Sequence, residues 1–220
     1  MTTRKVYTAE LEHLTTRVAD MGNQLERMII QVMQALDSLD AELAKDIIQQ
    51  DDIIDDFERE IEQSCINIVA KQAPVATDLR RVSSIMRIIS DIERIADHCG
   101  DVSEYIIDLA KEPVVPVPEG LKEMFVEMRR MVRKTINAFV DEEVQDIDRI
   151  IKDDDVIDNY FEQIKRNLCV SMEQHPELIK PYVDYLLITK YVERMGDHCT
   201  NIAEWVDFIV TGDLAEYMNC

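Results

Sequence analysis

The chain has 220 residues, and its 45 acidic against 24 basic side chains give a formal net charge of −21 at pH 7. Such a negative field repels phosphate backbones and anionic lipid headgroups, which argues against nucleic-acid binding and direct lipid contact. The chain has no uninterrupted run of about eighteen apolar residues and no signal pattern at its start, so we expect a cytoplasmic protein without membrane insertion. Few glycines and prolines among many Leu, Ile, Met, Glu and Arg residues predict an all-α fold.

Three helices are predicted in the first half. Apolar residues that step by three and four indicate a long amphipathic helix over residues 7–40. A second helix ends before Pro74, because the residue that precedes a proline avoids the α conformation. Thr77 or Asp78 is the expected N-cap of a third helix, which reaches about Lys111. The first half is therefore expected to form a helical hairpin with one further long helix.

The second half repeats this plan. Segment 113–120, with three prolines and a glycine, cannot be helical. Helices are predicted over 121–139 and 144–172, followed by a break at His175-Pro176 and a last helix to about residue 210, which Gly212 closes. Two three-helix bundles are expected.

A repeated phrase supports this division. Ile92–Cys99 returns one hundred residues later as Val192–Cys199, and Asp51–Asp55 matches Asp154–Asp158 at an offset of 103. Repetition of Glu, Arg, Asp and His at fixed offsets indicates a common origin or a common function of the two segments. Apolar residues alone would recur in any pair of similar helices. We therefore divide the chain into a first repeat at residues 1–112, a linker at 113–120 and a second repeat at 121–220.

Each half holds the spacing acid-x-x-x-Asp twice. On a helix such a pair shares one face, one turn apart, and the like charges cost about 0.2–0.5 kcal/mol, so each pair calls for a counter-cation or abundant solvent. In a chain this acidic, a single pair indicates little. The four pairs are Asp51 with Asp55, Glu93 with Asp97, Asp154 with Asp158, and Glu193 with Asp197.

The position of these pairs in the hairpins predicts that they converge. Those of the first half lie about 21 residues on either side of Pro74, and those of the second about 20 before and 19 after Pro176, so antiparallel helices bring them to equal heights. Four carboxylates per bundle suit a hard cation such as Mg²⁺, Mn²⁺, Ca²⁺ or oxidised iron, with plain solvated surface as the alternative. Glu193 and Asp197 point away from the apolar stripe of the last helix, which predicts clusters on the bundle surface.

Residues beside the clusters allow two interpretations each. His98 and His198 can be partly buried histidines or can reach the edge of a cluster. Arg94 and Arg194 can neutralise carboxylates of a neighbouring helix or bind an anion, and the first is favoured.

Other site classes are disfavoured by the sequence. A ferritin-like oxidase needs two Glu-x-x-His motifs, and the chain has one, from Glu10 to His13. Five cysteines without a CxxC pair argue against a disulfide framework and a thiolate zinc site. The sequence has no nucleophile motif, phosphate loop or dinucleotide fingerprint, so we do not expect an enzyme.

Three segments resemble the PhoU family, which regulates bacterial phosphate transport. They are Ala73-Pro74-Val75-Ala76-Thr77-Asp78-Leu79-Arg80 and the two Glu-Arg-(Ile/Met)-(Ala/Gly)-Asp-His phrases, the second of which continues as Asn201-Ile202-Ala203-Glu204. The resemblance covers essentially the whole chain. It implies two three-helix bundles related by pseudo-twofold symmetry, with metal clusters, iron first and Mg, Mn or Zn as alternatives, on their surface. The ligands carried over are Asp51, Asp55, Glu93, Asp97, Asp154, Asp158, Glu193 and Asp197, with Asp101 and Asn201 as further candidates.

The resemblance also implies a function and partners. It implies a non-enzymatic negative regulator, typically a homodimer, that couples the ATPase subunit of a phosphate ABC transporter to a phosphate sensor histidine kinase. Such a protein would reach the inner membrane only through protein partners. Three alternatives remain open: an accessory of a sodium-phosphate cotransporter, a metal-buffering or storage protein, and a structural helical dimer whose acidic faces bind nothing.

The two repeats differ at one position that matters for the clusters. The first has Gly100-Asp101 where the second has Thr200-Asn201, and asparagine is the usual residue in the resembling family. The two sites are therefore expected to differ in charge and affinity.

Overall fold

The computed structural model describes residues 3–72, 74, 76–142 and 147–213, and this part of the chain consists of helices and their connections, without a strand. The expected all-α fold is confirmed. The elements are α1 (Thr3–Ser38), α2 (Ala41–Gln72), α3 (Ala76–Leu109), α4 (Leu121–Asp141), α5 (Ile147–Gln174), the short 3₁₀ helix η1 (Pro176–Leu178) and α6 (Ile179–Thr211).

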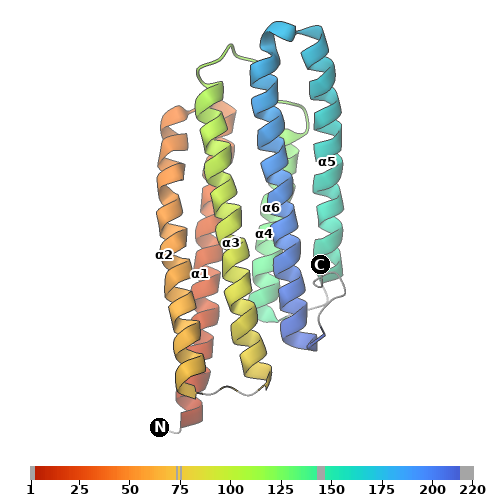
Figure 1. Ribbon diagram of the computed structural model, residues 1–220. Coiled ribbons are helices and arrows are strands. Elements are labelled where there is room, and N and C mark those ends of the chain that lie inside the picture. Colours follow the sequence, from red (N-terminus) through yellow and green to blue (C-terminus); the bar gives the residue numbers. More distant parts are fainter. Residues whose placement is uncertain (1–2, 73, 75, 143–146, 214–220) are drawn as a thin grey trace.

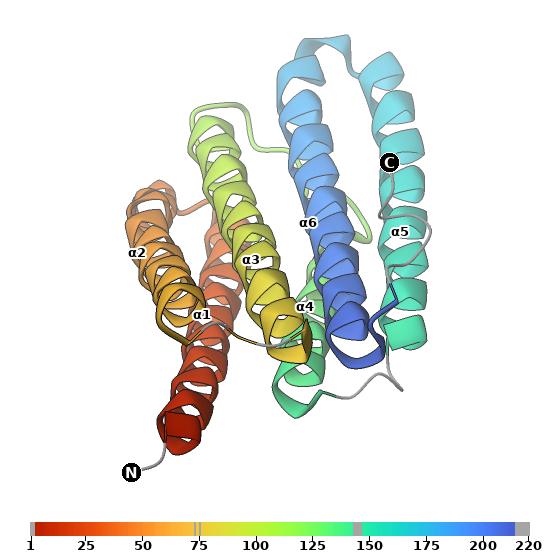
Figure 2. The ribbon, with the colours of Figure 1, turned by 60° about the horizontal axis from the view of Figure 1, so that its bottom comes forward.

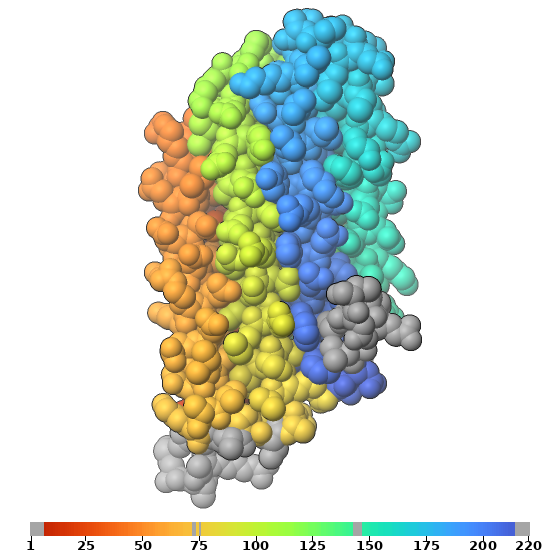
Figure 3. Space-filling view, viewed as in Figure 1, coloured from red at the N-terminus to blue at the C-terminus, as the bar shows by residue number. Residues whose placement is uncertain are grey.

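The six long helices form two three-helix bundles that lie side by side (Figure 1). Helices α1, α2 and α3 form the first and α4, α5 and α6 the second, and α3 packs against α6 at the junction. Helices α2, α3, α6 and α5 form one layer, with α1 and α4 behind it (Figures 1 and 2). Figure 3 shows the outer face of that layer, to which all four helices with predicted carboxylate pairs contribute.

Several helix ends differ from the sequence-based expectation. Helix α3 already begins at Ala76, so the predicted N-cap at Thr77 or Asp78 was wrong. The expected start of the fifth helix at Val144 lies outside the described residues. The last helix does end at Gly212, whose φ is 82° and whose N–H donates to the Phe208 carbonyl.

The interior is built from the apolar stripes of the six helices, which are buried along their length. Cys65, Cys99 and Cys199 are buried free thiols, Cys169 is an exposed one, and Cys220 lies outside the described residues. No helix in the described ranges is long and apolar enough to cross a membrane.

Asp40 fixes the start of α2. Its Oδ1 accepts hydrogen bonds from the backbone N–H groups of Glu42 and Leu43, both at 3.1 Å. Replacing such a cap by alanine costs about 1 kcal/mol. We expect Asp40→Ala to lower the Tm by roughly 2–4 °C in a thermal melt. Asp40→Asn, which keeps the accepting oxygen, is the control, and equal melting of Asp40→Ala and the wild type would contradict the cap.

Candidate functional site

The first carboxylate cluster lies between α2 and α3. Asp51 and Asp55 come from α2, and Glu93 and Asp97 from α3. Burial raises the pKa of Asp51 to about 6, and the negative charges of Asp97 and Asp55 act in the same direction. Burial likewise raises the pKa of Glu93 to about 7, with Asp97 next in effect. The structure thus brings together the two carboxylate pairs of the first half, which the sequence predicted to lie at the same level along the antiparallel helices.

Glu58 joins this cluster, although the sequence analysis did not single it out. It follows Asp55 by three residues on α2, so it lies on nearly the same helix face. Burial raises its pKa, and Glu62 and Asp55 add to the rise. Its charge in turn raises the pKa of Glu93. The i, i+3 spacing from Asp55 was the signal that could have identified it.

The second cluster repeats the arrangement between α5 and α6. Asp154 and Asp158 belong to α5, and Glu193 and Asp197 to α6. Burial raises the pKa of Asp154 to about 7, followed by the charges of Asp158 and Asp197. The pKa values of Asp158 and Asp197 are also raised, chiefly by burial and then by Glu193. Each half therefore holds a cluster of acidic side chains in which burial and neighbouring negative charges raise the pKa of several carboxyl groups.

One carboxylate oxygen in each cluster is buried without a partner. Asp51 Oδ1 and Asp154 Oδ1 are buried and accept no hydrogen bond in the described structure. The two residues occupy matching positions in the repeat. A buried oxygen without a donor is costly unless a proton or a cation meets it. This observation, together with the oxygen-only donor set, fits a hard metal ion.

Basic side chains currently pair with several of these acids. Arg94 contacts Glu93 at 3.7 Å and Asp97 at 3.2 Å, and Lys190 pairs with Glu193. Arg94 thus forms its close ion pairs within its own helix, because i, i+3 spacing places Asp97 within reach. Its charge also counteracts the rise in the pKa of Glu58 on the neighbouring helix α2. In the part of the chain that is described, no three His, Cys, Asp or Glu side chains are arranged to hold one ion. Binding a metal would therefore require carboxylates to rotate away from these cations.

The raised pKa values predict how metal-free stability depends on pH. Asp154 has a pKa of about 7 in the folded chain against the ordinary value of 3.8 for an aspartate. The folded state therefore binds more protons than the unfolded state between about pH 4 and 7, and stability falls as pH rises through this window. We expect the Tm in chelator to be lower at pH 8 than at pH 5.5, and Asp154→Asn to flatten this difference.

Asp155→Asn is the matched control for that experiment. It removes the same charge one residue away, from an exposed position. An equal flattening by both variants would show that the overall charge of the chain, rather than the cluster, sets the pH dependence.

The two histidines lie where α3 meets α6. The His98 and His198 ring centroids are 5.6 Å apart. His98 Nδ1 is 3.2 Å from Asp101 Oδ2, and His198 Nδ1 is 2.8 Å from Asp91 Oδ1. Asn201 Nδ2 donates to the same Asp91 oxygen at 3.2 Å. Both histidines are thus engaged at the junction of the halves, and Asp101 and Asn201 accompany them there.

Two of the residues predicted to lie in or beside the clusters, Arg194 and Asp101, act through their charge on His98 and Asp51. Burial lowers the pKa of His98, and the charge of Arg194 adds to the lowering. Asp101 is hydrogen-bonded to His98, and its negative charge also raises the pKa of Asp51. Asp91 was not predicted as a site residue, because the matching residue of the second repeat is Tyr191 and the repeat therefore gave no signal there.

The packing of the two clusters is not identical. A Cβ on Gly196 would lie 2.5 Å from Asp154 Oδ1, so the second cluster packs directly on the α6 backbone. The first repeat has Ala96 at the matching position. The nearby Thr200 side chain, whose hydroxyl donates to the Gly196 carbonyl at 3.3 Å, counteracts the rise in the Asp154 pKa, whereas the first repeat has Gly100 at that position.

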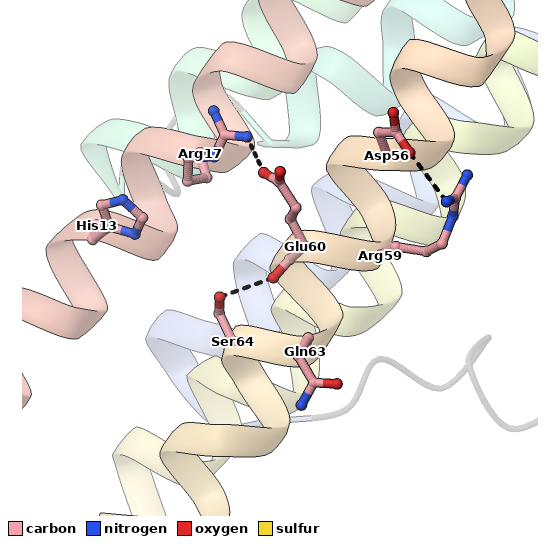
Figure 4. A pocket seen from close by; sticks show the side chains of 7 residues that line it. All are labelled: His13, Arg17, Asp56, Arg59, Glu60, Gln63 and Ser64. Carbon is pink, nitrogen blue, oxygen red and sulfur yellow. Dashed lines mark hydrogen bonds and ion pairs between the residues drawn. The ribbon is translucent and has the colours of Figure 1, made fainter.

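A separate groove of about 580 Å³ runs between α1 and α2 (Figure 4). Arg17 of α1 pairs with Glu60 of α2, and Arg59 contacts Asp56 at 3.0 Å. The positive charges of both arginines are thus neutralised by acidic side chains that also line the groove. The lining residues are His13, Arg17, Asp56, Arg59, Glu60, Gln63 and Ser64.

Both halves of the chain match one family model, described as the PhoU domain, over residues 18–106 and 121–206. The chain belongs to the PhoU family. The resemblance read from the three sequence segments is confirmed. The model's two matches leave out residues 107–120, which include the proline-rich segment.

PhoU relatives cover nearly the full chain. A Clostridium acetobutylicum protein named a homolog of the phosphate-specific transport system accessory protein PhoU is 32% identical over 96% of each chain. The Escherichia coli accessory protein PhoU is 29% identical over 94% of this chain and 86% of its own. The crystal structure of PhoU from Pseudomonas aeruginosa superposes with a TM-score of 0.88 at 30% identity, covering 94% of this chain and 100% of that one. The phosphate transport system regulatory protein PhoU from Streptococcus pneumoniae also gives 0.88, at 28% identity and 96% and 99% coverage.

Proposed function

We propose that this PhoU protein is a non-enzymatic accessory of a phosphate transport system that restrains phosphate uptake and phosphate-starvation signalling. The observation that carries this proposal is its similarity, over 96% of both chains, to a relative named as a homolog of such an accessory protein. The duplicated helical bundle supplies two long faces and no catalytic motif, which suits an adaptor.

The proposed role includes metal binding at both carboxylate clusters. Asp51, Asp55, Glu93 and Asp97 would hold one cluster, and the unpartnered Asp51 oxygen supports this assignment. Oxygen donors suit hard cations in general, and the resemblance to the PhoU family favours iron, with Mg, Mn or Zn as alternatives. A bound cation would neutralise the like charges and link the two helices that supply them. In the second half, Asp154, Asp158, Glu193 and Asp197 would do the same.

The proposed partners are the ATPase subunit of a phosphate ABC transporter and a phosphate sensor histidine kinase. The protein would act as a homodimer in the cytoplasm and reach the membrane through these proteins. An accessory role beside a sodium-phosphate cotransporter is the alternative within phosphate transport. The two roles differ in the transporter that the protein binds. A pull-down with each purified transporter component would show which of them binds.

Deletion of the gene tests the proposal. In phosphate-replete medium, we expect starvation-gene expression and phosphate uptake to rise in the deletion strain and to return to normal with the wild-type gene. Unchanged uptake and expression would refute the phosphate role. The unpartnered carboxylates favour a second candidate, metal buffering. A change in cellular iron or manganese without a phosphate phenotype would support that candidate instead.

A further inference from the structure

Helix α4 carries a concentration of positive charge that the metal clusters do not use. Residues 129–134 read Arg-Arg-Met-Val-Arg-Lys, four cations in six positions of a chain with net charge −21. Met131 and Val132 are buried, while Arg130 and Arg133 are exposed. The cations therefore share the outer side of the helix. We call Arg129, Arg130, Arg133 and Lys134, with the exposed Val126, the α4 basic surface.

Two carboxylates lie beneath this surface, one from each neighbouring helix. Glu26 of α1 and Asp153 of α5 have only 16% and 14% of their side chains exposed. The cations above them are more open, with Arg133 at 56% and Arg130 at 43%. Arg129 Nε donates to Glu26 at 2.8 Å and Arg133 pairs with the same carboxylate, while Arg130 and Lys134 contact Asp153 at 3.2 and 2.6 Å.

The pairing does not cancel the outward charge. Burial alone would raise the pKa of Glu26, yet hydrogen bonds from Arg133 and Arg129 lower it overall, so this carboxylate is held ionised under its two guanidinium groups. Each buried acid takes two cations, and Glu127, the third acid in contact, pairs with Arg130. Four cations against the three acids that contact them leave one net positive charge, and the most exposed members of the group are Arg133 and Arg130.

The position and composition of the surface suit protein docking. Helices α1 and α4 lie behind the layer that carries the metal clusters (Figures 1 and 2). Val126 is 53% exposed at one end of the basic run, and arginines beside exposed apolar side chains are typical of interface centres. Cations that are already fixed by buried carboxylates lose little side-chain entropy when they bind.

We propose that the α4 basic surface docks an Asp/Glu-rich face of a partner protein. A protein fits better than a membrane or a nucleic acid, because an extended anion would also meet the field of the remaining chain, which is strongly negative. A local acidic patch of similar size can match the four cations and orient its protein on approach. This inference concerns a surface separate from the metal clusters and does not depend on phosphate regulation.

Photo-crosslinking tests the docking surface. A photo-reactive phenylalanine replaces Val126 in the full chain inside its own cells, and the control replaces Val170 of α5, which is equally exposed at 52%. We expect a protein adduct from position 126 whose crosslinked peptide is rich in Asp and Glu, and at least about fivefold less adduct from position 170. Equal adducts, no adduct at 126, a lipid adduct alone or a second copy of this chain alone would overturn the proposal.

A variant that removes two of the positive charges provides a second test of the docking surface. Arg130→Gln/Arg133→Gln removes the two most exposed cations and leaves Arg129 and Lys134 to pair with the buried acids. We expect the adduct from position 126 to fall at least about fivefold while the Tm and metal content stay at their wild-type values. The metal measurement is needed because Asp153 directly precedes Asp154 of the second cluster. An adduct unchanged by this variant would also overturn the proposal.

Discussion

Replacement of Glu93 by Gln and of Asp97 by Asn is expected to abolish metal binding at the first cluster and to leave the second cluster loaded. The substitutions keep the side-chain size and remove two anionic donors, which hard cations require. Elemental analysis of protein purified without an affinity tag should then show about half the metal per chain. Glu193→Gln/Asp197→Asn should give the reciprocal loss, and the fourfold variant should bind almost none.

The same variants should also differ in thermal stability when metal is present. A ligand at one hundred times its Kd stabilises the folded state by about 2.7 kcal/mol per site. Loss of one loaded site should therefore lower the metal-dependent gain in Tm by roughly 5–10 °C. Asp52→Asn is the control, because it removes an exposed charge beside Asp51. Equal metal content in the wild type and in all three cluster variants would refute the assignment of these residues.

Rotation of side chains is part of this prediction. Arg94 now contacts both Glu93 and Asp97, so a cation must compete with a guanidinium at the first cluster. Arg94→Gln should therefore strengthen metal binding there. Isothermal titration of each variant with Mg²⁺ and Mn²⁺ measures this competition, and weaker binding by Arg94→Gln would mean that Arg94 organises the site rather than blocks it.

The sequence was most informative where one helix or one hairpin decides the outcome. Periodic apolar residues predicted the long helices, and distance from Pro74 placed Asp51 beside Asp97, because helical rise and hairpin closure leave little freedom. Contacts between the halves were less accessible. Asp91 binds His198 across the junction of α3 and α6, and no repeat or spacing within either half encodes which helices of two bundles meet.

The α4 basic surface illustrates the same limit. The run of cations is plain in the sequence, but its meaning depends on Glu26, which precedes Arg129 by 103 residues. Only the packing of α1 against α4 shows that this carboxylate lies beneath the guanidinium groups and leaves them facing outward. Sequence reasoning alone would treat the run as an ordinary solvated helix face.

Gly22 provides the strongest test of how tightly the two halves are joined. It lies on α1 where α1 packs on α4, and a Cβ there would meet Ile136 Cγ1, Cδ1 and Cγ2 at 2.8, 2.9 and 3.0 Å. Cγ1 and Cγ2 are attached directly to the Cβ of a buried, branched side chain, so they cannot swing away easily. We expect Gly22→Val to cost about 3 kcal/mol, which a denaturant titration would measure as a lower midpoint.

A second glycine and a second substitution make this result specific. A Cβ on Gly100, also within a helix, would meet nothing within 4 Å, so Gly100→Ala should stabilise the chain by up to about 1 kcal/mol while Gly22→Ala destabilises it. Ile136→Ala alone should cost about 2–5 kcal/mol. Combined with Gly22→Val it should cost less than the sum, because each change makes room for the other. Strict additivity of the two substitutions would mean that α1 and α4 can separate at this point, and that the bundles are held together by α3 and α6 alone.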